Sequence, residues 1–308
     1  MDPSKVFYGI FLLIVLSTRK IFQVNCDTEE TMGPQTKRVA PVLKQPKDIE
    51  EVINSYLTPN SKLAILLDYD GTLAPIAANP NITSMTVEVE KALHKITSNP
   101  KVFAAVISGR GIVDVQNKVG IKNITYGGNH GIEIQNPDGS RKDYELPAEI
   151  QSNYTELVHD LRRQLAKNGA WVEDKRVSLT YHYRDTPADK IENQRLEAIR
   201  IIESHGFRAN QAHFAIEAKP PVNWNKGEAT KFILEQKFGK NYANEGNLKI
   251  VFAGDDTTDE DAMRVLQGIG RTFRIASDPK METYADYRLP EQQLMTPLLQ
   301  YIANIYKD

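Results

Sequence analysis

Three stretches of the sequence place acidic or hydroxyl side chains directly after a run of apolar residues: Asp68 to Thr72, Ser108 to Arg110, and Gly254 to Asp261. Taken singly, each is the kind of polar segment that forms an ordinary turn after a strand. Taken together they indicate a site, because ligands of open parallel sheets bind in the crevice beyond the carboxyl ends of the strands. We therefore expect these segments to meet at one edge of a sheet and to share one chemistry.

Asp68 is the candidate nucleophile of this site. A carboxylate attacks phosphorus only where the repulsion between two anions is cancelled, so it requires a divalent cation and fixed positive charge nearby. The side chains of Asp68, Asp255 and Asp259 and the backbone carbonyl of Asp70 offer the hard oxygen ligands that Mg²⁺ prefers. Asp256 is either a further ligand or a partner of one. The sequence thus predicts phosphoryl transfer to Asp68 with Mg²⁺ as cofactor.

Three further side chains are expected to complete the chemistry. Asp70 lies two residues beyond Asp68, and Gly71 turns the chain so that Asp70 is placed to protonate the leaving alkoxide and later to activate water. Ser108 offers a hydroxyl to a phosphoryl oxygen. Lys226 stands at a predicted helix start, where its charge and the helix dipole both favour a phosphate. The plainer alternatives are that Ser108 caps the next helix and that Lys226 is a solvated helix residue.

The surrounding pattern predicts the elements that hold these residues. Apolar runs at 63–67 and 102–107 are typical of strands buried on both faces of a parallel sheet, and an amphipathic helix lies between them. The same pattern returns with a helix from Lys226 and a strand at 248–253. Between 147 and 220 the order changes to helix, two strands, helix, two strands, which predicts an inserted α+β lobe.

The predicted fold class is therefore α/β. A Rossmann-like parallel-sheet core is assigned to residues 61–146 and 221–308, and an inserted α+β cap to residues 147–220. Residues 27–60 are predicted to form a polar linker, as far as Gln45, followed by a short lead-in helix.

Charge and cysteine content exclude several function classes. The 308 residues include 38 Lys and Arg against 40 Asp and Glu, a formal net charge of -2. This balance provides no global basic field, so a nucleic-acid partner is not expected. The only cysteine, Cys26, excludes an internal disulfide framework and a thiolate metal cage. The expected partner is a small anionic molecule that is met by local charge.

Residues 1–26 have the pattern of a targeting segment. Lys5 precedes the apolar run Val6 to Leu16, which has the length of a signal-peptide apolar region and is short for a membrane span. Cleavage after Cys26 would remove the segment and place the chain in the secretory pathway. The alternatives are an uncleaved membrane anchor and a non-targeting tail on a cytoplasmic protein.

Four motifs carry a resemblance to a known family. The segments are Asp68-Tyr-Asp-Gly-Thr-Leu73, Ser108-Gly-Arg110, Asn225-Lys-Gly227 and Gly254-Asp-Asp-Thr-Thr-Asp-Glu-Asp261. They look like the motifs of the haloacid dehalogenase superfamily, and their residues are close to those of trehalose-6-phosphate phosphatases. The similarity runs from about Lys62 to the end of the chain. It implies a phospho-Asp68 intermediate, Mg²⁺ and a mobile cap.

Three other segments resemble the sugar-contacting parts of that family: Gly128 to Glu133, Lys175 to Arg184, and Glu217 to Pro220. The family more often has Arg where this chain has Lys219, an exchange that keeps the charge and loses bidentate geometry. The plainer alternatives are that Lys175 is a hairpin-tip charge and that the ring of His182 is satisfied locally. The resemblance implies substrate contacts for Arg110, Asn129, His130, Glu133, Lys175, Ser178, His182, Arg184 and Glu217.

The expected activity is hydrolysis of trehalose 6-phosphate to trehalose and phosphate. The alternatives are a phosphatase of the same fold for another sugar phosphate, a catalytically silent sugar-phosphate sensor, and a signalling receiver. A receiver is disfavoured because the paired acids before the phosphorylated strand are missing and a large insertion is present. The chain contains no disaccharide synthase domain, so a synthase would be a separate chain, and its protein partners are unknown.

Overall fold

The computed structural model describes residues 36–77, 80–212 and 214–307. The segment that the sequence indicates as a signal peptide, residues 1–26, lies outside the described residues. Within the described ranges, no helix combines the length and the apolar character that a bilayer span requires.

The core is a seven-stranded sheet in the order β13-β11-β10-β2-β3-β4-β5, and every neighbouring pair is parallel except β4 with β5. This is the predicted α/β architecture with a parallel sheet. The strands are β2 (Lys62–Leu67), β3 (Val102–Ile107), β4 (Thr125–Gly128), β5 (Glu133–Gln135), β10 (Leu248–Gly254), β11 (Arg271–Ile275) and β13 (Tyr287–Leu289).

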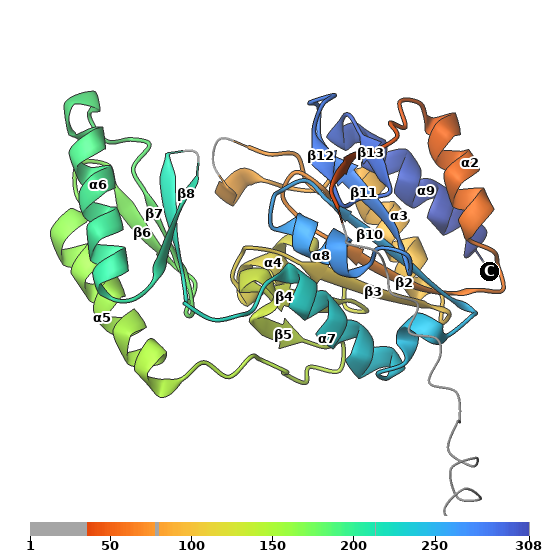
Figure 1. Cartoon of the computed structure of the whole chain (residues 1–308), viewed down its shortest axis with the longest axis horizontal. Coiled ribbons are helices and arrows are strands. Elements are labelled where there is room, and N and C mark those ends of the chain that lie inside the picture. Colours follow the sequence, from red (N-terminus) through yellow and green to blue (C-terminus); the bar gives the residue numbers. More distant parts are fainter. Residues whose placement is uncertain (1–35, 78–79, 213, 308) are drawn as a thin grey trace, which may run out of the picture. The chain divides into compact units, whose positions relative to one another are not determined.

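Helices cover both faces of this sheet, as Figure 1 shows. On β2, Leu63, Ile65 and Leu67 pack into one apolar cluster, whereas Ala64 and Leu66 pack into the other. Because successive side chains of a strand point to opposite faces, a continuous apolar run buries both. The first cluster includes α2 (Pro46–Tyr56), α3 (Val87–Ser98), α4 (Ile112–Val119) and α9 (Met295–Ile305), and the second includes α7 (Lys226–Phe238) and α8 (Asp259–Val265).

The inserted segment forms its own antiparallel sheet in the order β6-β7-β9-β8. Two helices cover one face of this sheet (Figure 1) and share an apolar cluster with it that contains Leu157, Leu161, Tyr181 and Ile216. The opposite face carries polar side chains. The elements are α5 (Ala148–Leu165), β6 (Trp171–Asp174), β7 (Leu179–His182), α6 (Ala188–Ser204), β8 (Arg208–Ala212) and β9 (Ala215–Lys219).

The predicted linker differs from the structure over residues 36–45. There β1 (Arg38–Val39) pairs with β12 (Glu282–Thr283), and the backbone of Arg288 exchanges hydrogen bonds with Pro41 and Leu43. Leu43 is buried in the core. Polar composition concealed this docking, because one small added strand needs only backbone pairing and a single apolar anchor. Short 3₁₀ turns complete the chain at η2 (Pro80–Ile82), η3 (Asn129–Gly131), η4 (Tyr242–Asn244) and η5 (Gln292–Leu294).

Candidate active site

Polar residues follow three neighbouring strands at the same edge of the core sheet. Asp68 comes directly after β2, Ser108 after β3 and Asp255 after β10. The register places Leu67 beside Ala253 on one side and beside Val106 on the other, so the three strands end at the same level. The structure therefore brings these segments together at one edge of the sheet, as the sequence predicts.

Lys226 joins two of the carboxylates in this crevice. Its Nζ donates hydrogen bonds to Oδ1 of Asp68 at 2.6 Å and to Oδ1 of Asp259 at 2.7 Å. All three side chains are buried. The lysine is presented by the first turn of α7, which Asn225 caps by accepting from the backbone N–H of Glu228. Lys226 is thus a buried charge in the site, not a solvated helix residue.

The donor set fits a divalent cation. Asp68, Asp255 and Asp259 each offer an oxygen, and these oxygens lie within 4.8 Å of one another. Three carboxylates share one lysine, so the cluster holds excess negative charge that a divalent cation bound by oxygen ligands would balance. Asp256 stands apart, because its exposed carboxylate accepts hydrogen bonds from the backbone and hydroxyl of Thr257.

Electrostatic effects in this cluster are large because it is buried. Burial and the charge of Asp259 raise the pKa of Asp255 to about 7. Burial also raises the pKa of Asp68, although Lys226 opposes this. For Lys226, burial alone would lower the pKa, but the carboxylates of Asp259 and Asp68 raise it well above the ordinary value. The lysine therefore stays cationic, and the carboxylates gain from any added positive charge.

Gly71 allows the two acidic loops to approach each other. Its φ is +75°, and a Cβ at this position would lie 2.1 Å from Oδ2 of Asp255. Any side chain here would both strain the backbone and displace a carboxylate of the acidic cluster. The glycine that the sequence indicated as a turn residue therefore also makes room for Asp255.

Asp70 points to a different partner from Asp68. Its two carboxylate oxygens accept hydrogen bonds from Nε and Nη2 of Arg110, each at 2.7 Å. Arg110 is buried and also donates to Asp114 and to Thr83. Arg110 was expected to contact substrate, and in this structure its guanidinium bonds the carboxylate of Asp70. Ser108 is buried nearby, where its Oγ accepts from the backbone N–H of Arg110.

A buried polar layer lies behind the loop that carries Asp255 and Asp259. Arg274 donates to the backbone carbonyl of Asp256, and its Nε lies 3.6 Å from Oε1 of Glu260. Glu260 in turn accepts from the hydroxyl of Thr283 and from the backbone N–H of Tyr284. The loop that carries Asp255 and Asp259 is therefore fixed from behind.

The cap touches the core next to this site. Nζ of Lys175 donates to the carbonyl of Gly109 at 3.2 Å, and Oγ of Ser178 donates to Oδ1 of Asn129 at 2.5 Å. Nε2 of His130 lies 3.2 Å from Oε1 of Glu217. These contacts join residues from the polar face of the cap sheet to the segment that follows β3 and to η3, which follows β4.

Glu217 is surrounded by positive and potentially positive groups. Lys219 lies 3.0 Å from its Oε2, and Lys175 lies 4.0 Å from its Oε1. Burial alone would raise the pKa of Glu217, but His130 and Lys219 hold it below the ordinary value. Burial lowers the pKa of His130 despite the neighbouring carboxylate. The arrangement therefore combines an ionised acceptor, a neutral imidazole and two ammonium donors.

A cleft of about 180 Å³ lies between this part of the cap and Lys226. Its walls include Asn129, His130, Ser178, Lys219 and Lys226. Two buried atoms of its lining residues, Nδ1 of His130 and Nε1 of Trp224, have no hydrogen-bond partner among the described residues. Because buried polar atoms are normally paired, the site has capacity for a polar ligand.

Comparison with known proteins agrees with this arrangement. Residues 66–293 match the model of the trehalose-phosphatase family. The chain belongs to that family. A probable trehalose-phosphate phosphatase of Oryza sativa subsp. japonica is 31% identical over 252 residues, which cover 78% of this chain and 66% of the rice protein. The trehalose-phosphate phosphatase of Mycobacterium bovis is 31% identical over 230 residues, 73% of this chain and 57% of that protein.

The solved structures agree on the fold. The C-terminal domain of a trehalose-6-phosphate phosphatase from C. albicans has a TM-score of 0.68 at 21% identity, and the match covers 86% of this chain and 98% of that one. At this identity the likeness shows the fold alone, which is the capped parallel-sheet fold of haloacid dehalogenase-like hydrolases. The chain spans less than two thirds of the length of the first two curated trehalose-phosphatase relatives.

Three residues that the family resemblance assigned to substrate are engaged elsewhere. Glu133 accepts from Asn129 and from Arg141, so it supports Asn129 from behind. His182 forms a hydrogen bond with Glu173 at 2.9 Å. Arg184 is exposed and lies over the ring of Phe214. The structure therefore does not bring His182 and Arg184 to the cap–core contacts.

The sequence analysis missed Glu173. In the structure of this trehalose-phosphatase family member, Glu173 lies on the polar face of the cap sheet. The alternation of side chains along β6 is the signal that identifies it, since Val172 packs toward the helices and Glu173 must face the other way. Arg208 was also missed. It pairs in register with Lys219 and lines the same cleft.

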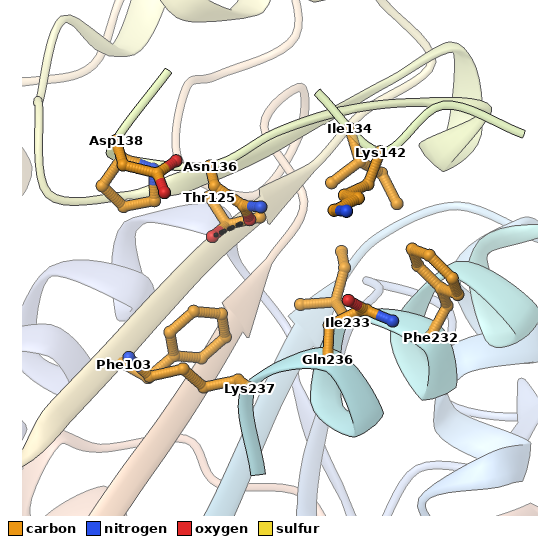
Figure 2. Close-up of a pocket in the computed structure, with 11 residues that line it drawn as sticks. Phe103, Thr125, Ile134, Asn136, Asp138, Lys142, Phe232, Ile233, Gln236 and Lys237 are labelled. Atoms are coloured by element: carbon orange, nitrogen blue, oxygen red, sulfur yellow. Dashed lines mark hydrogen bonds between the residues drawn. The ribbon is translucent and has the colours of Figure 1, made fainter. Parts of the chain in front are cut away.

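A larger cavity of about 330 Å³ lies away from the active site (Figure 2). It is lined by Phe103, Lys142, Phe232 and Lys237 together with neighbouring residues, and Figure 2 shows α7 on one side and the β5 region on the other. None of the residues assigned to catalysis or substrate lines it. The chemistry is therefore not assigned to this larger cavity, because size alone does not supply reactive groups.

Proposed function

We propose that the chain is a phosphomonoesterase that hydrolyses trehalose 6-phosphate to trehalose and inorganic phosphate. The observation that carries this proposal is the position of Asp68, which follows a buried strand, bonds Lys226 and shares a metal-binding cluster with Asp255 and Asp259. Family membership and the names of the relatives support trehalose 6-phosphate as the substrate.

The proposed reaction has two steps. In the first, a carboxylate oxygen of Asp68 bonds to phosphorus, the bond from phosphorus to the sugar oxygen breaks, and Asp70 protonates that oxygen. In the second, Asp70 takes a proton from water, the water oxygen bonds to phosphorus, and the bond to Asp68 breaks. For both steps Asp70 must exchange part of its pairing with Arg110 for the substrate, and its carboxylate is 38% exposed and free to do so.

Mg²⁺ is the proposed cofactor. Asp68, Asp255 and Asp259, with the backbone carbonyl of Asp70, would hold it, and when bound it stabilises negative charge on the phosphoryl oxygens. Lys226, at the start of α7, places a second positive charge next to Asp68. Together these charges reduce the repulsion between the carboxylate and the phosphate.

The test is phosphate release from a panel of trehalose 6-phosphate, sucrose 6-phosphate, glucose 6-phosphate and an aryl phosphate, with Mg²⁺ and after exhaustive chelation. Trehalose 6-phosphate is expected to have the highest kcat/KM, and chelation is expected to abolish turnover. Preference for another sugar phosphate would replace the substrate assignment. Binding of sugar phosphates without turnover of any of them would make the chain a sensor.

We also propose that the apolar run Val6 to Leu16 directs the chain into the secretory pathway. Its length and the preceding Lys5 support this, since both are features of signal peptides. Mapping the N-terminus of protein made in eukaryotic cells tests it. Soluble cytoplasmic protein that keeps this segment would contradict the proposal.

A further inference from the structure

The polar face of the cap sheet is built of three rows of side chains. Register pairs Arg208 with Lys219, then Glu173 with Thr180 and Glu217 with Asn210, and finally Trp171 with His182. We name these the proximal, middle and distal rows. Lys175 and Ser178 extend the proximal row, and Ala215 and Ala212 extend the distal row. Every row faces away from α5 and α6, because the intervening residues fill the apolar cluster.

Contacts with the core show which rows of the cap sheet face the active site. In the proximal row, Lys175 and Ser178 bond Gly109 and Asn129, which belong to the segments beside Ser108 and Lys226. In the middle row, Glu217 contacts His130. The polar face therefore turns its proximal and middle rows toward the active site, and the distal row lies beyond them along the strands.

The distal row holds an aromatic surface. The Trp171 ring lies flat on the His182 ring, with 4.1 Å between centroids and 15° between planes, and Glu173 fixes that imidazole. Trp171 is nonetheless 40% exposed. Trp171 lies on the edge strand β6, so His182 is its one cross-strand neighbour, and the rest of the distal row consists of the small residues Ala215 and Ala212. A large ring held rigidly and left partly exposed on a polar face is suited to ligand contact.

Spacing connects this surface to the substrate. Residues two apart on a strand are about 7 Å apart, so the distal row lies two such steps, about 14 Å, beyond the proximal row. A phosphorylated disaccharide extends by one ring per step. On β6 the next step beyond Glu173 of the middle row is Trp171, so a substrate that extends from the phosphate site along this strand comes to the Trp171 ring.

We propose that Trp171, backed by His182, is the platform for the sugar ring farther from the phosphate and thereby selects disaccharide over monosaccharide phosphates. The inference rests on the proposed function. One face of a pyranose ring presents C–H groups, whose partial positive charge is attracted to the negative face of an indole, and packing the two together removes apolar surface from water. His182 acts as a positioning residue, since it holds the indole in place from beneath.

The first test compares Trp171→Ala and Trp171→Phe with wild type on trehalose 6-phosphate and glucose 6-phosphate. The ratio of the two kcat/KM values is expected to fall roughly tenfold or more in Trp171→Ala, mainly through KM for the disaccharide, and less in Trp171→Phe. Leu196→Ala is the matched control, because Leu196 is an exposed apolar residue of α6, on the helical side of the cap. An unchanged ratio in a folded Trp171→Ala protein would overturn the inference.

The second test needs no turnover. The chain has 2 tryptophans, and Trp224 lines the active-site cleft, so Trp224 is kept and the signal of Trp171 is the difference between Asp68→Asn and Asp68→Asn with Trp171→Phe. Because Asp68→Asn stops hydrolysis, trehalose 6-phosphate is expected to shift and quench this difference signal, and glucose 6-phosphate to leave it nearly unchanged. Equal responses to both ligands would overturn the platform. If wild type hydrolyses trehalose 6-phosphate and both tests fail, only the platform is wrong. If the wild type does not hydrolyse it, both the proposed function and the proposed platform are wrong.

Discussion

The guanidinium of Arg110 donates two parallel hydrogen bonds of 2.7 Å to the carboxylate of Asp70. The expected acid and base of the reaction is therefore held by a planar fork that is itself buried and anchored by Thr83 and Asp114. A lysine could supply the charge but not the fork. This pairing sets the position of the Asp70 carboxylate before the substrate binds.

Disturbing this pair should affect poor leaving groups most. Arg110→Lys is expected to lower kcat for a sugar phosphate by roughly 10- to 100-fold, because Asp70 is no longer oriented. An aryl phosphate, whose leaving group needs little protonation, is expected to lose much less. Stopped assays on both substrates measure the difference. Equal losses on both would mean that Arg110 acts on the phosphoryl group or on folding.

Asp68→Asn is expected to reduce turnover on the order of 10³-fold or more, because the amide cannot form the phosphoryl-enzyme bond. Asp138→Asn is a suitable control, since Asp138 is an exposed acid that lines the cavity away from the active site and lies outside the metal cluster. Mass spectrometry of acid-quenched enzyme is expected to find phosphate on Asp68 in the wild type. Turnover of Asp68→Asn within tenfold of the wild type would rule this nucleophile out.

Stability of the metal-free protein should depend on Asp255. Because its pKa is raised from 3.8 to about 7, the folded state keeps a proton that the unfolded chain releases. This contribution to stability is present in full below about pH 4 and is lost as the pH rises toward 7. Urea unfolding with chelator is expected to show this decline and to show it flattened in Asp255→Asn.

Added Mg²⁺ should reverse that trend, since the cation binds the ionised carboxylate and its affinity rises with pH. Asp256→Asn is the matched control, because Asp256 is exposed and outside the cluster. A pH profile identical in wild type and Asp255→Asn would contradict the assignment.

Lys175 and Glu217 should govern substrate selection. Either residue replaced by Ala is expected to reduce kcat/KM for trehalose 6-phosphate by roughly 10²-fold, on the scale of lost hydrogen bonds to charged groups. Aryl phosphate hydrolysis is expected to fall much less, since that substrate does not extend to the cap. Parallel losses on both substrates would show that these side chains support the fold or the chemistry instead.

The buried pair behind the metal loop should contribute to stability. Glu260→Gln leaves Arg274 with an uncompensated charge, so the free energy of unfolding is expected to fall by roughly 3 kcal/mol. Glu282→Gln is the control, because Glu282 is an exposed acid on β12, the strand that holds Thr283. Denaturant titration measures both. An effect no larger than that of the control would mean that the pair is structurally neutral.

The sequence by itself located the reactive groups at strand ends. An uninterrupted apolar run such as 63–67 is stable only when both faces are covered, which requires a parallel sheet with helices on each side, and the residue after the run then lies at the carboxyl edge. Asp68, Ser108 and Asp255 follow directly from this local pattern. Lys226 does too, because it begins a helix that returns to the same edge.

Tertiary structure alone decided which of these groups are partners. Lys226 bonds Asp68 from a position 158 residues away, and Arg110 bonds Asp70 from a position 40 residues away. The stacking of Trp171 on His182 likewise depends on the register of β6 against β7. Sequence periodicity gives the face on which a side chain lies, but it carries no information about which distant segment is brought opposite, because packing and register are settled by the whole chain.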